Sequence, residues 1–280
     1  MLKSNFLKNI TRGVQKKVKV LIANPYREVN VNWFTLKYYK HLPAGRIRTH
    51  KLFNKLLYFC SPTELLHGLK EIFIDKIYKQ ELPDNPFIID CGANIGMSVI
   101  YMKEHFPQAE IIAFEPDETN FELLTRNISS FGYEGVLLNK EAVWNENTTL
   151  PFSNNSSMGS KIEMNSTTGT KEVKAVRLKD FICREVDFLK IDIEGAENVV
   201  LTDIAGNLHF VKNMFLEYHG TFDQNKELVN MINIVNEAGF NFYIKEAAPI
   251  YNTPFERIKN PNSPYDVQLN IFCFRDMPGR

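Results

Sequence analysis

The fold of this chain is decided by residues 87–96, which read FIIDCGANIG. The apolar start of this stretch predicts a buried strand that ends in the carboxylate of Asp90 and is followed by a glycine-containing turn into a helix. A second apolar run, IIAF at residues 111–114, also ends in an acid, Glu115. Ligands of doubly wound α/β sheets bind beyond the carboxyl ends of the strands, and an acid about twenty residues after the first turn suits ribose hydroxyls. The two runs together predict a nucleoside pocket.

The glycines of this turn indicate which nucleoside is bound. A dinucleotide site has the pattern Gly-x-Gly-x-x-Gly, whose backbone amides close on a pyrophosphate. Only Gly92 and Gly96 are present here, and Asp90 precedes them and would repel an anion. The ammonium and sulfonium groups of S-adenosylmethionine (SAM) are cationic, so an acidic loop suits them. A nicotinamide-dependent oxidoreductase and an ordinary strand–turn–helix with an incidental aspartate are the alternatives.

The composition excludes several other classes of protein. Lys and Arg number 33, as do Asp and Glu, so the chain has no overall basic character of the kind that nucleic-acid-binding proteins show. Its four cysteines include no Cys-x-x-Cys pair, so neither a zinc site nor a disulfide framework is predicted. No apolar run is long enough to span a membrane, and the charged N-terminus does not resemble a secretory signal. We therefore expect a cytoplasmic protein.

Two domains are predicted, with the boundary at the Pro83–Pro86 turn. Residues 1–84 are expected to form a helical and hairpin extension, to which analogy alone gives a role as a lid or acceptor platform. Residues 1–20 carry six Lys and Arg and no acid, with apolar residues at helical spacing; such a helix lies on an anionic membrane or packs on its own domain. A hairpin is expected over 45–60 and a helix from Ser61, as N-cap, to about Leu82.

Residues 85–280 alternate between strand and helix patterns, which predicts a Rossmann-like α/β domain. We expect a seven-stranded, mostly parallel sheet with helices on both faces. The strands are predicted near 87–91, 110–114, 136–139, 186–193, 212–218, 240–246 and 267–274, and the helices near 95–105, 117–130, 195–203 and 224–238. An inserted β-ribbon, 148–152 with 172–176, flanks a polar loop at 153–170. This loop and the proline-rich segment 248–264 either shape an acceptor pocket or are solvent-exposed connectors.

Charged residues at the ends of two predicted strands indicate a site. In FLKIDIEG, residues 188–195, side-chain alternation places Lys190, Asp192 and Glu194 on one side of the strand. The next strand ends in Glu217 and His219. Buried charges are costly unless they are paired or bind a ligand, so one cluster is expected at the same edge as Asp90 and Glu115. An ion pair of Lys190 with Asp192 that only fixes the edge of the sheet is the structural alternative, with Glu197 merely beginning the next helix.

At these residues the chain resembles the FkbM family of SAM-dependent methyltransferases. The resemblance covers roughly residues 87–274, and the order and spacing of its four blocks make it more specific than any one of them. The blocks are Asp90–Gly96, Phe114-Glu115-Pro116, Lys190–Glu197 and Glu217-Tyr218-His219. The family implies a Rossmann-like methyltransferase that acts on hydroxyl groups of sugars, polyketides or similar small acceptors.

The resemblance also implies a role for each matched residue. The cofactor-binding residues are Asp90, Gly92, Asn94, Gly96, Glu115, Ala142 and Val143. The first four would line the methionine end of SAM, Glu115 would bind the ribose, and a turn at 141–143 would lie along the adenine. The catalytic residues are His219, Asp192 and Glu194. His219 is the first candidate for the general base, because an unperturbed pKa of about 6.5 leaves it largely neutral.

The predicted activity is O-methylation of a sugar or polysaccharide precursor or a similar small acceptor, with S-adenosylhomocysteine as product. No dedicated metal site is predicted, although a less favoured variant has Asp192, Glu194 and His219 holding a divalent metal ion that acidifies the hydroxyl. A catalytically silent SAM-binding module and a polyketide- or lipid-directed methyltransferase are the alternatives. A saccharide or other small molecule is the expected partner, without nucleic acid or an integral membrane segment, and a homo-oligomer is compatible with the sequence.

Overall fold

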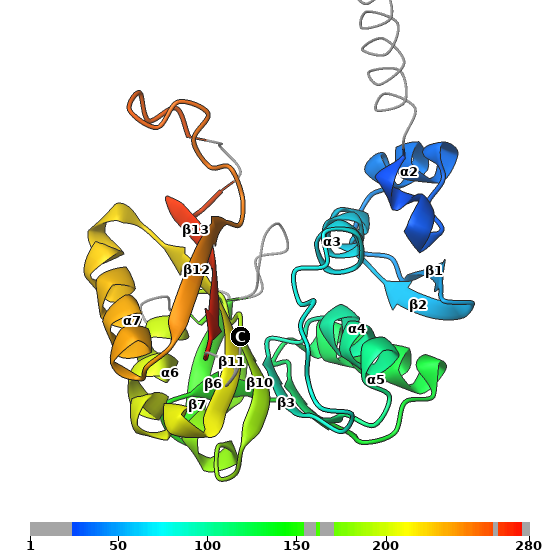
Figure 1. The fold of residues 1–280 in the computed structure, drawn as a ribbon. Coiled ribbons are helices and arrows are strands. Elements are labelled where there is room, and N and C mark those ends of the chain that lie inside the picture. Colours follow the sequence, from blue (N-terminus) through cyan, green and yellow to red (C-terminus); the bar gives the residue numbers. More distant parts are fainter. Residues whose placement is uncertain (1–23, 154–160, 163–170, 260–262, 276–280) are drawn as a thin grey trace, which may run out of the picture. The chain divides into compact units, whose positions relative to one another are not determined.

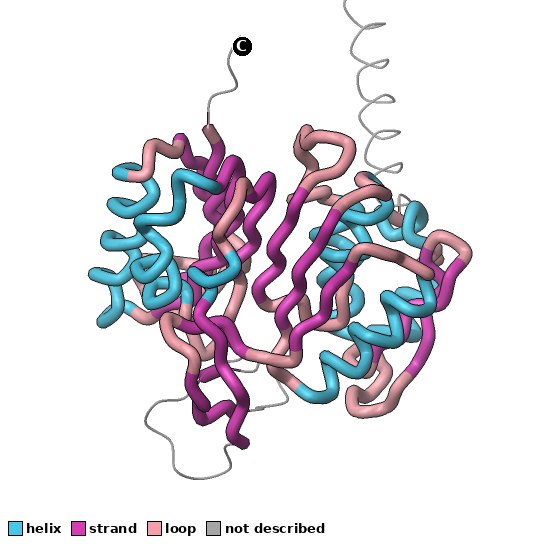
Figure 2. The backbone as a smooth tube through the Cα atoms, turned by 90° about the horizontal axis from the view of Figure 1, so that it is seen from below, coloured by secondary structure: helices cyan, strands magenta, loops and turns pink. Residues whose placement is uncertain are grey.

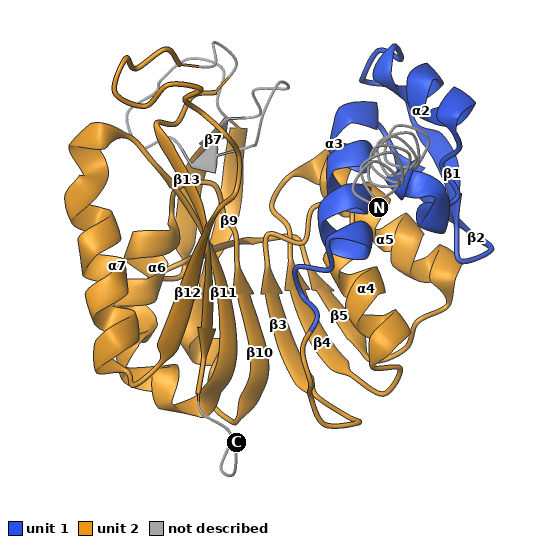
Figure 3. Ribbon diagram, turned by 45° about the horizontal axis from the view of Figure 1, so that its top comes forward, with its two compact units in different colours: residues 1–79 blue, residues 80–280 orange. Residues whose placement is uncertain are grey.

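The computed structural model describes residues 24–153, 161–162, 171–259 and 263–275. The chain divides into two compact units, residues 1–79 and 80–280, coloured separately in Figure 3. The division falls a few residues before the turn at which the sequence predicts it. The helix expected over residues 1–20 lies outside the described residues.

The first unit contains short helices around one hairpin. Its elements are the 3-10 helix η1 (Pro25–Val29), α2 (Trp33–Lys40), β1 (Arg48–Leu52), β2 (Lys55–Phe59), α3 (Pro62–Gly68) and the π-helical η2 (Leu69–Ile74). The hairpin expected over 45–60 is confirmed, and Ser61 caps α3 by accepting a hydrogen bond from the Glu64 N–H. The expectation that this helix continues to about Leu82 is wrong. Lys76 has a left-handed backbone (φ 55°), which a continuing helix cannot accommodate.

The second unit is built on the predicted seven-stranded sheet. Its strands are β3 (Phe87–Cys91), β4 (Glu110–Phe114), β5 (Val136–Asn139), β10 (Val186–Ile191), β11 (Val211–Gly220), β12 (Asn241–Glu246) and β13 (Val267–Phe274). They lie in the order β12-β13-β11-β10-β3-β4-β5, and β13 runs in the opposite direction to the other six strands. The chain order reverses between β3 and β10, which is where an α/β sheet of this kind binds its ligand.

Helices cover both faces of this sheet, so the Rossmann-like fold is confirmed. Figure 1 shows α4 (Met97–His105) and α5 (Glu118–Phe131) on one side and α6 (Glu197–Ile204) and α7 (Asn225–Glu237) on the other, and Figure 2 shows the strands between them. Every residue of β3 and β10 is buried, because these two central strands are covered on both faces. None of the helices in the described ranges is long and apolar enough to cross a membrane.

The inserted ribbon is part of a second, four-stranded sheet. As predicted, β7 (Thr148–Ser153) pairs antiparallel with β9 (Lys171–Arg177), but β8 (Lys161–Ile162) and β6 (Ala142–Trp144) extend the pair. The turn expected at 141–143 is therefore wrong. Ala142 and Val143 pair in parallel with β9 and are buried, which makes this segment a strand. Most of the loop expected over 153–170 lies outside the described residues.

Candidate active site

Lys190 joins the carboxyl ends of β3 and β10. It lies beside Asp90 in the parallel register of these strands, and its Nζ atom is 3.3 Å from Asp90 Oδ1 and 3.2 Å from Asp192 Oδ2. The same ammonium group donates a hydrogen bond of 2.9 Å to the carbonyl oxygen of Gly92. Ser98, at the start of α4, donates to the other oxygen of Asp90 at 2.5 Å. The ion pair proposed as a structural alternative is therefore present, and it belongs to the predicted cluster.

The two glycines of the first turn adopt a left-handed backbone and are closely packed. Gly92 has φ +83°, and a Cβ atom there would lie 1.8 Å from the carbonyl oxygen of Asp192. Gly96 has φ +88°, and its Cβ would lie 2.6 Å from the Leu124 side chain on α5. Any other residue would add a strained φ at both positions, and at Gly92 it would also force the two backbone segments apart. The turn after β3 therefore lies directly against the turn after β10, where Asp192 is located.

Asn94 and Glu115, which the sequence assigns to the same cofactor, are in direct contact. Glu115 is buried at the end of β4 and accepts hydrogen bonds from the backbone N–H groups of Asn94 (2.8 Å) and Asp117 (2.9 Å). Burial raises the pKa of Glu115 to about 7, although the two N–H groups oppose the shift. Each carboxylate oxygen has two lone pairs, so Glu115 retains acceptor capacity for ligand hydroxyls.

Ala142 and Val143 lie in apolar surroundings. Ala142 packs with Trp144, Leu150 and Ala175 in a small cluster beside the second sheet, and Val143 belongs to the main core. Their side chains are almost fully buried, so contact with an adenine ring requires that the ring lie directly on β6. Their role in cofactor binding remains a prediction.

His219, on β11, is surrounded by carboxylates. Its Nδ1 atom lies 3.3 Å from Glu197 Oε1, and its Nε2 atom lies 3.4 Å from Glu217 Oε1 and 3.7 Å from Glu194 Oε2. Burial lowers the pKa of His219, but the hydrogen bonds and charges of these glutamates outweigh it, so the pKa lies well above 6.5. The surrounding glutamates therefore favour the protonated ring over the neutral imidazole expected from the sequence, and the role of His219 as the base remains a prediction.

Glu197 fixes the turn between β10 and α6. It is almost fully buried and accepts hydrogen bonds from the backbone N–H groups of Ile193 (3.1 Å) and Gly195 (2.9 Å). The sequence left open that Glu197 merely begins the next helix. In the structure Glu197 does stand at the start of α6, and it also contacts His219. Glu197 orients the imidazole ring while it shapes the turn that carries Asp192 and Glu194.

Glu194 has an unusual backbone and an unusual proton affinity. Its φ of 58° lies in the left-handed region, and its Oε2 atom accepts a hydrogen bond of 3.1 Å from the hydroxyl of Tyr265. Burial, reinforced by nearby carboxylates and opposed by His219, raises the pKa of Glu194 to about 7. Sequence analysis missed Tyr265 and Ser98 as site residues. Tyr265 is 71 positions from Glu194, and nothing in the local pattern before β13 distinguishes it from a core tyrosine.

The arrangement as a whole is suited to binding a cation. Six carboxylates at this edge surround two cations, Lys190 and His219; the carboxylates are those of Asp90, Glu115, Asp192, Glu194, Glu197 and Glu217. Asp192, Glu194 and His219 also each offer one ligand atom within 4.8 Å of the others. Two carboxylates and an imidazole held by a further carboxylate form a donor set that suits a divalent metal ion, provided that His219 Nε2 loses its proton.

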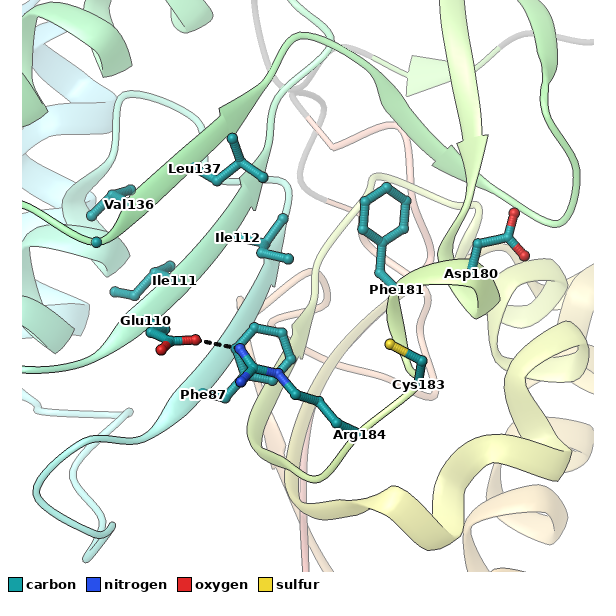
Figure 4. A pocket seen from close by; sticks show the side chains of 11 residues that line it. Phe87, Glu110, Ile111, Ile112, Val136, Leu137, Asp180, Phe181, Cys183 and Arg184 are labelled. Carbon is teal, nitrogen blue, oxygen red and sulfur yellow. Dashed lines mark hydrogen bonds and ion pairs between the residues drawn. The ribbon is translucent and has the colours of Figure 1, made fainter.

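A separate pocket lies at the opposite end of the sheet. It has a volume of about 550 Å³ and is lined by residues at the amino ends of β3, β4 and β5, together with residues 180–184 (Figure 4). Arg184 lies over the ring of Phe87, 3.8 Å from its centroid, and forms an ion pair with Glu110. No residue of the carboxylate cluster lines this pocket.

Comparison with known proteins adds a family and several relatives. The family model of the methyltransferase FkbM domain matches residues 90–242. Methyltransferase 1 of Beauveria bassiana is 33% identical over 165 residues, which cover 49% of this chain and 66% of that protein. Methyltransferase sdnD of Sordaria araneosa is 48% identical over 73 residues, 26% of this chain and 28% of that protein. The chain thus matches just under two thirds of the first relative and less of the second.

A solved structure with a similar fold is the methyltransferase FkbM from Methylobacillus flagellatus KT. It is 14% identical to this chain, with a TM-score of 0.48, and the match covers 70% of this chain and 46% of that one. The structure of TYW2 from M. jannaschii in complex with AdoMet is 11% identical, with a TM-score of 0.45 over 84% of this chain and 90% of that one.

Proposed function

This chain belongs to the methyltransferase FkbM domain family, and from that premise we propose that it transfers the methyl group of SAM to a hydroxyl group of a sugar or polysaccharide precursor, or of a similar small acceptor. The observation that carries the proposal is the excess of carboxylates at the carboxyl edge of the sheet, beside the strand-order reversal between β3 and β10. Uncompensated buried carboxylates are costly, and a cationic ligand removes that cost.

The residues at the ends of β3 and β4 fit SAM. The Oδ1 atom of Asp90 is buried and, among the described residues, accepts no hydrogen bond, although Lys190 lies 3.3 Å away. It could therefore accept one from the ammonium group of SAM. Glu115 has acceptor capacity for the two ribose hydroxyls. When bound, SAM supplies an electrophilic methyl group. Asp90 and Asn94 would hold the methionine end of SAM, and Glu115 would hold its ribose.

On the acceptor side, we assign the proton transfer to Glu194. A general base works best when its pKa is close to the working pH, and the pKa of Glu194 is about 7. The raised pKa of His219 favours its protonated form, which would donate a hydrogen bond to Glu217 and place a positive charge 3.7 Å from Glu194. The Tyr265 hydroxyl donates a hydrogen bond to the same Glu194 oxygen. Asp192, whose side chain is partly exposed, would orient the acceptor hydroxyl.

The N-terminal unit and the segment 248–264 are proposed to contribute to acceptor binding. Tyr265, which immediately follows that segment, contacts Glu194, so this insertion is tied to the candidate active site. The bonds that Tyr251 and Lys259 make to Asp266, of 2.7 Å and 2.8 Å, hold the described part of the insertion in place. A lid or acceptor platform formed by residues 1–84 remains a proposal by analogy.

Two measurements test the proposal in sequence. Calorimetric titration with SAM and with S-adenosylhomocysteine tests the cofactor, and absence of heat with both would overturn the whole assignment. Formation of S-adenosylhomocysteine is then followed with sugar, polyketide and lipid hydroxyl acceptors. Turnover only with polyketide or lipid acceptors would replace the saccharide assignment. Binding without turnover on any acceptor would favour a silent SAM-binding module.

A further inference from the structure

The zero net charge of the chain hides a strong separation of charge. Residues 1–79 contain sixteen Lys and Arg and four Asp and Glu, which gives a formal charge of +12. Residues 80–280 contain the remaining seventeen Lys and Arg and twenty-nine Asp and Glu, a formal charge of −12. Such an asymmetry indicates that the basic unit binds an anionic partner. The equal numbers of basic and acidic residues in the whole chain conceal this separation of charge.

The basic unit also exposes large aromatic side chains on one helix. On α2, Phe34 is 87% exposed, Tyr38 60% and Trp33 57%. Phe34 and Tyr38 are four residues apart and therefore neighbours on the helix surface. The opposite face of α2 is buried: Tyr39 packs edge-on against Phe59 of the hairpin, with ring centroids 5.6 Å apart. The aromatic face is therefore the outward face of a helix that is fixed from behind.

Exposed cations lie on α2, and an exposed cation and an exposed aliphatic residue follow it in the sequence. Lys37 and Lys40 are exposed on α2, and each lies within one turn of an exposed aromatic residue. After the helix, Arg46 is exposed beside Ile47, whose side chain is 52% exposed. Exposed aliphatic groups next to basic ones are typical of segments that lie in a bilayer interface. Single-stranded nucleic acid is bound chiefly by a positively charged groove and by aromatic side chains on which the bases stack.

We propose that the outward face of α2 docks on the surface of an anionic lipid bilayer. Trp33, Phe34 and Tyr38 would enter the headgroup region, where aromatic side chains are favoured, and the lysines would pair with lipid phosphates. The sequence of residues 1–20, basic and apolar at helical spacing, is of the same kind, although it lies outside the described residues. This proposal does not depend on methyl transfer.

Trp33 provides a natural reporter for the test. The chain has two tryptophans, and the other one, Trp144, is buried in the second unit. The full chain is mixed with phosphatidylcholine vesicles with or without phosphatidylglycerol, and emission and co-sedimentation are measured. We expect a blue shift and pelleting only with the anionic vesicles, both reversed by high salt. The shift should be absent in Trp33→Phe, which still pellets.

Substitutions then assign the binding to this face. Replacing Lys37 and Lys40 by Gln should weaken vesicle binding about fivefold for each lysine, and Phe34→Ser should weaken it further. Lys245→Gln and Phe255→Ser, at exposed positions of the second unit, should change nothing. All five positions are exposed, so the variants should fold.

Three outcomes would overturn the proposal. One is the absence of any shift or pelleting with anionic vesicles at low salt. Another is a Trp33 shift that depends on protein concentration without vesicles, which would show that this face contacts the acidic unit of a second copy. The third is a shift with single-stranded RNA and none with anionic vesicles, which would identify a nucleic-acid surface.

Discussion

Lys190 and Asp90 form a buried ion pair across the two central strands of the sheet, with 3.3 Å between Nζ and Oδ1 and only 4% of either side chain exposed. The pair lies where the chain order of the strands reverses, and Lys190 reaches Asp192 from the same position. Its members thus hold together the turns that carry both the predicted cofactor residues and the predicted catalytic residues.

Replacing Lys190 by Met should destabilise the protein strongly, because it leaves the Asp90 carboxylate buried without a counter-charge. Removal of one partner of such a pair costs roughly 3–5 kcal/mol. Lys140→Met is the matched control: this lysine pairs with Glu118 at 2.7 Å, and the two side chains are 46% and 58% exposed, so its loss should cost about 1 kcal/mol or less. Urea denaturation of both variants measures the difference. Equal losses of unfolding free energy in the two variants would show that Asp90 is solvated or protonated.

Stability should fall as the pH rises from about 5 to 8. The pKa values of Glu115 and Glu194 are raised to about 7, and that of His219 is also raised, so in this range the folded protein binds more protons than the unfolded chain. The stability from these protonated groups is complete at low pH and is lost as pH passes their folded pKa values. Glu115 alone contributes roughly 3 kcal/mol. Thermal unfolding midpoints across the range test this, and a midpoint that rises toward pH 8 would contradict it.

Much of this organisation could be predicted from local sequence, for identifiable reasons. The seven strands are apolar runs bounded by turns, and the ends of β3 and β10 carry charges that a buried strand does not tolerate without cause. The raised pKa of His219 could not be predicted, because it depends on Glu197 and Glu217, which approach the ring only in the folded sheet. Tyr265 was missed for the same reason. The strand at Ala142 was missed because its partner, β9, follows a long insertion.

Glu115→Gln should lower the affinity for SAM by roughly 10- to 100-fold, the equivalent of losing a hydrogen bond to a charged group. Both oxygens of Glu115 already accept backbone N–H groups, so an amide there also loses one of these contacts. Glu110→Gln, at the opposite end of β4 and 62% exposed, is the control and should bind SAM normally. Calorimetric titration of both variants measures the effect. Unchanged binding by Glu115→Gln would remove the ribose assignment.

The pH profile of methyl transfer should distinguish Glu194 from His219 as the base. If Glu194 accepts the proton, the rate should rise through its pKa of about 7, and Glu194→Gln should lose 10²–10⁴-fold in rate. His219→Gln, which removes a positive charge beside Glu194, should shift the profile to higher pH while retaining part of the activity. Tyr265→Phe should shift it slightly in the same direction, since its hydroxyl favours the ionised carboxylate. Loss of activity in EDTA, restored by Mg²⁺ or Mn²⁺, would instead favour the metal variant.

Gly92→Ala should disturb the site more than any other single methyl group added to this turn. The new Cβ would lie 1.8 Å from the Asp192 carbonyl oxygen, at a φ of +83° that alanine rarely adopts, so the two turns must separate. We expect a loss of more than about 2 kcal/mol in stability, together with weaker SAM binding, because Asp90 and Asp192 would no longer share Lys190. Gly206→Ala is the control: no atom lies within 4 Å of its Cβ position and its φ is not left-handed, so its stability should change by about 0.5 kcal/mol or less. A stable Gly92→Ala protein that binds SAM normally would show that the contact between these turns does not organise the site.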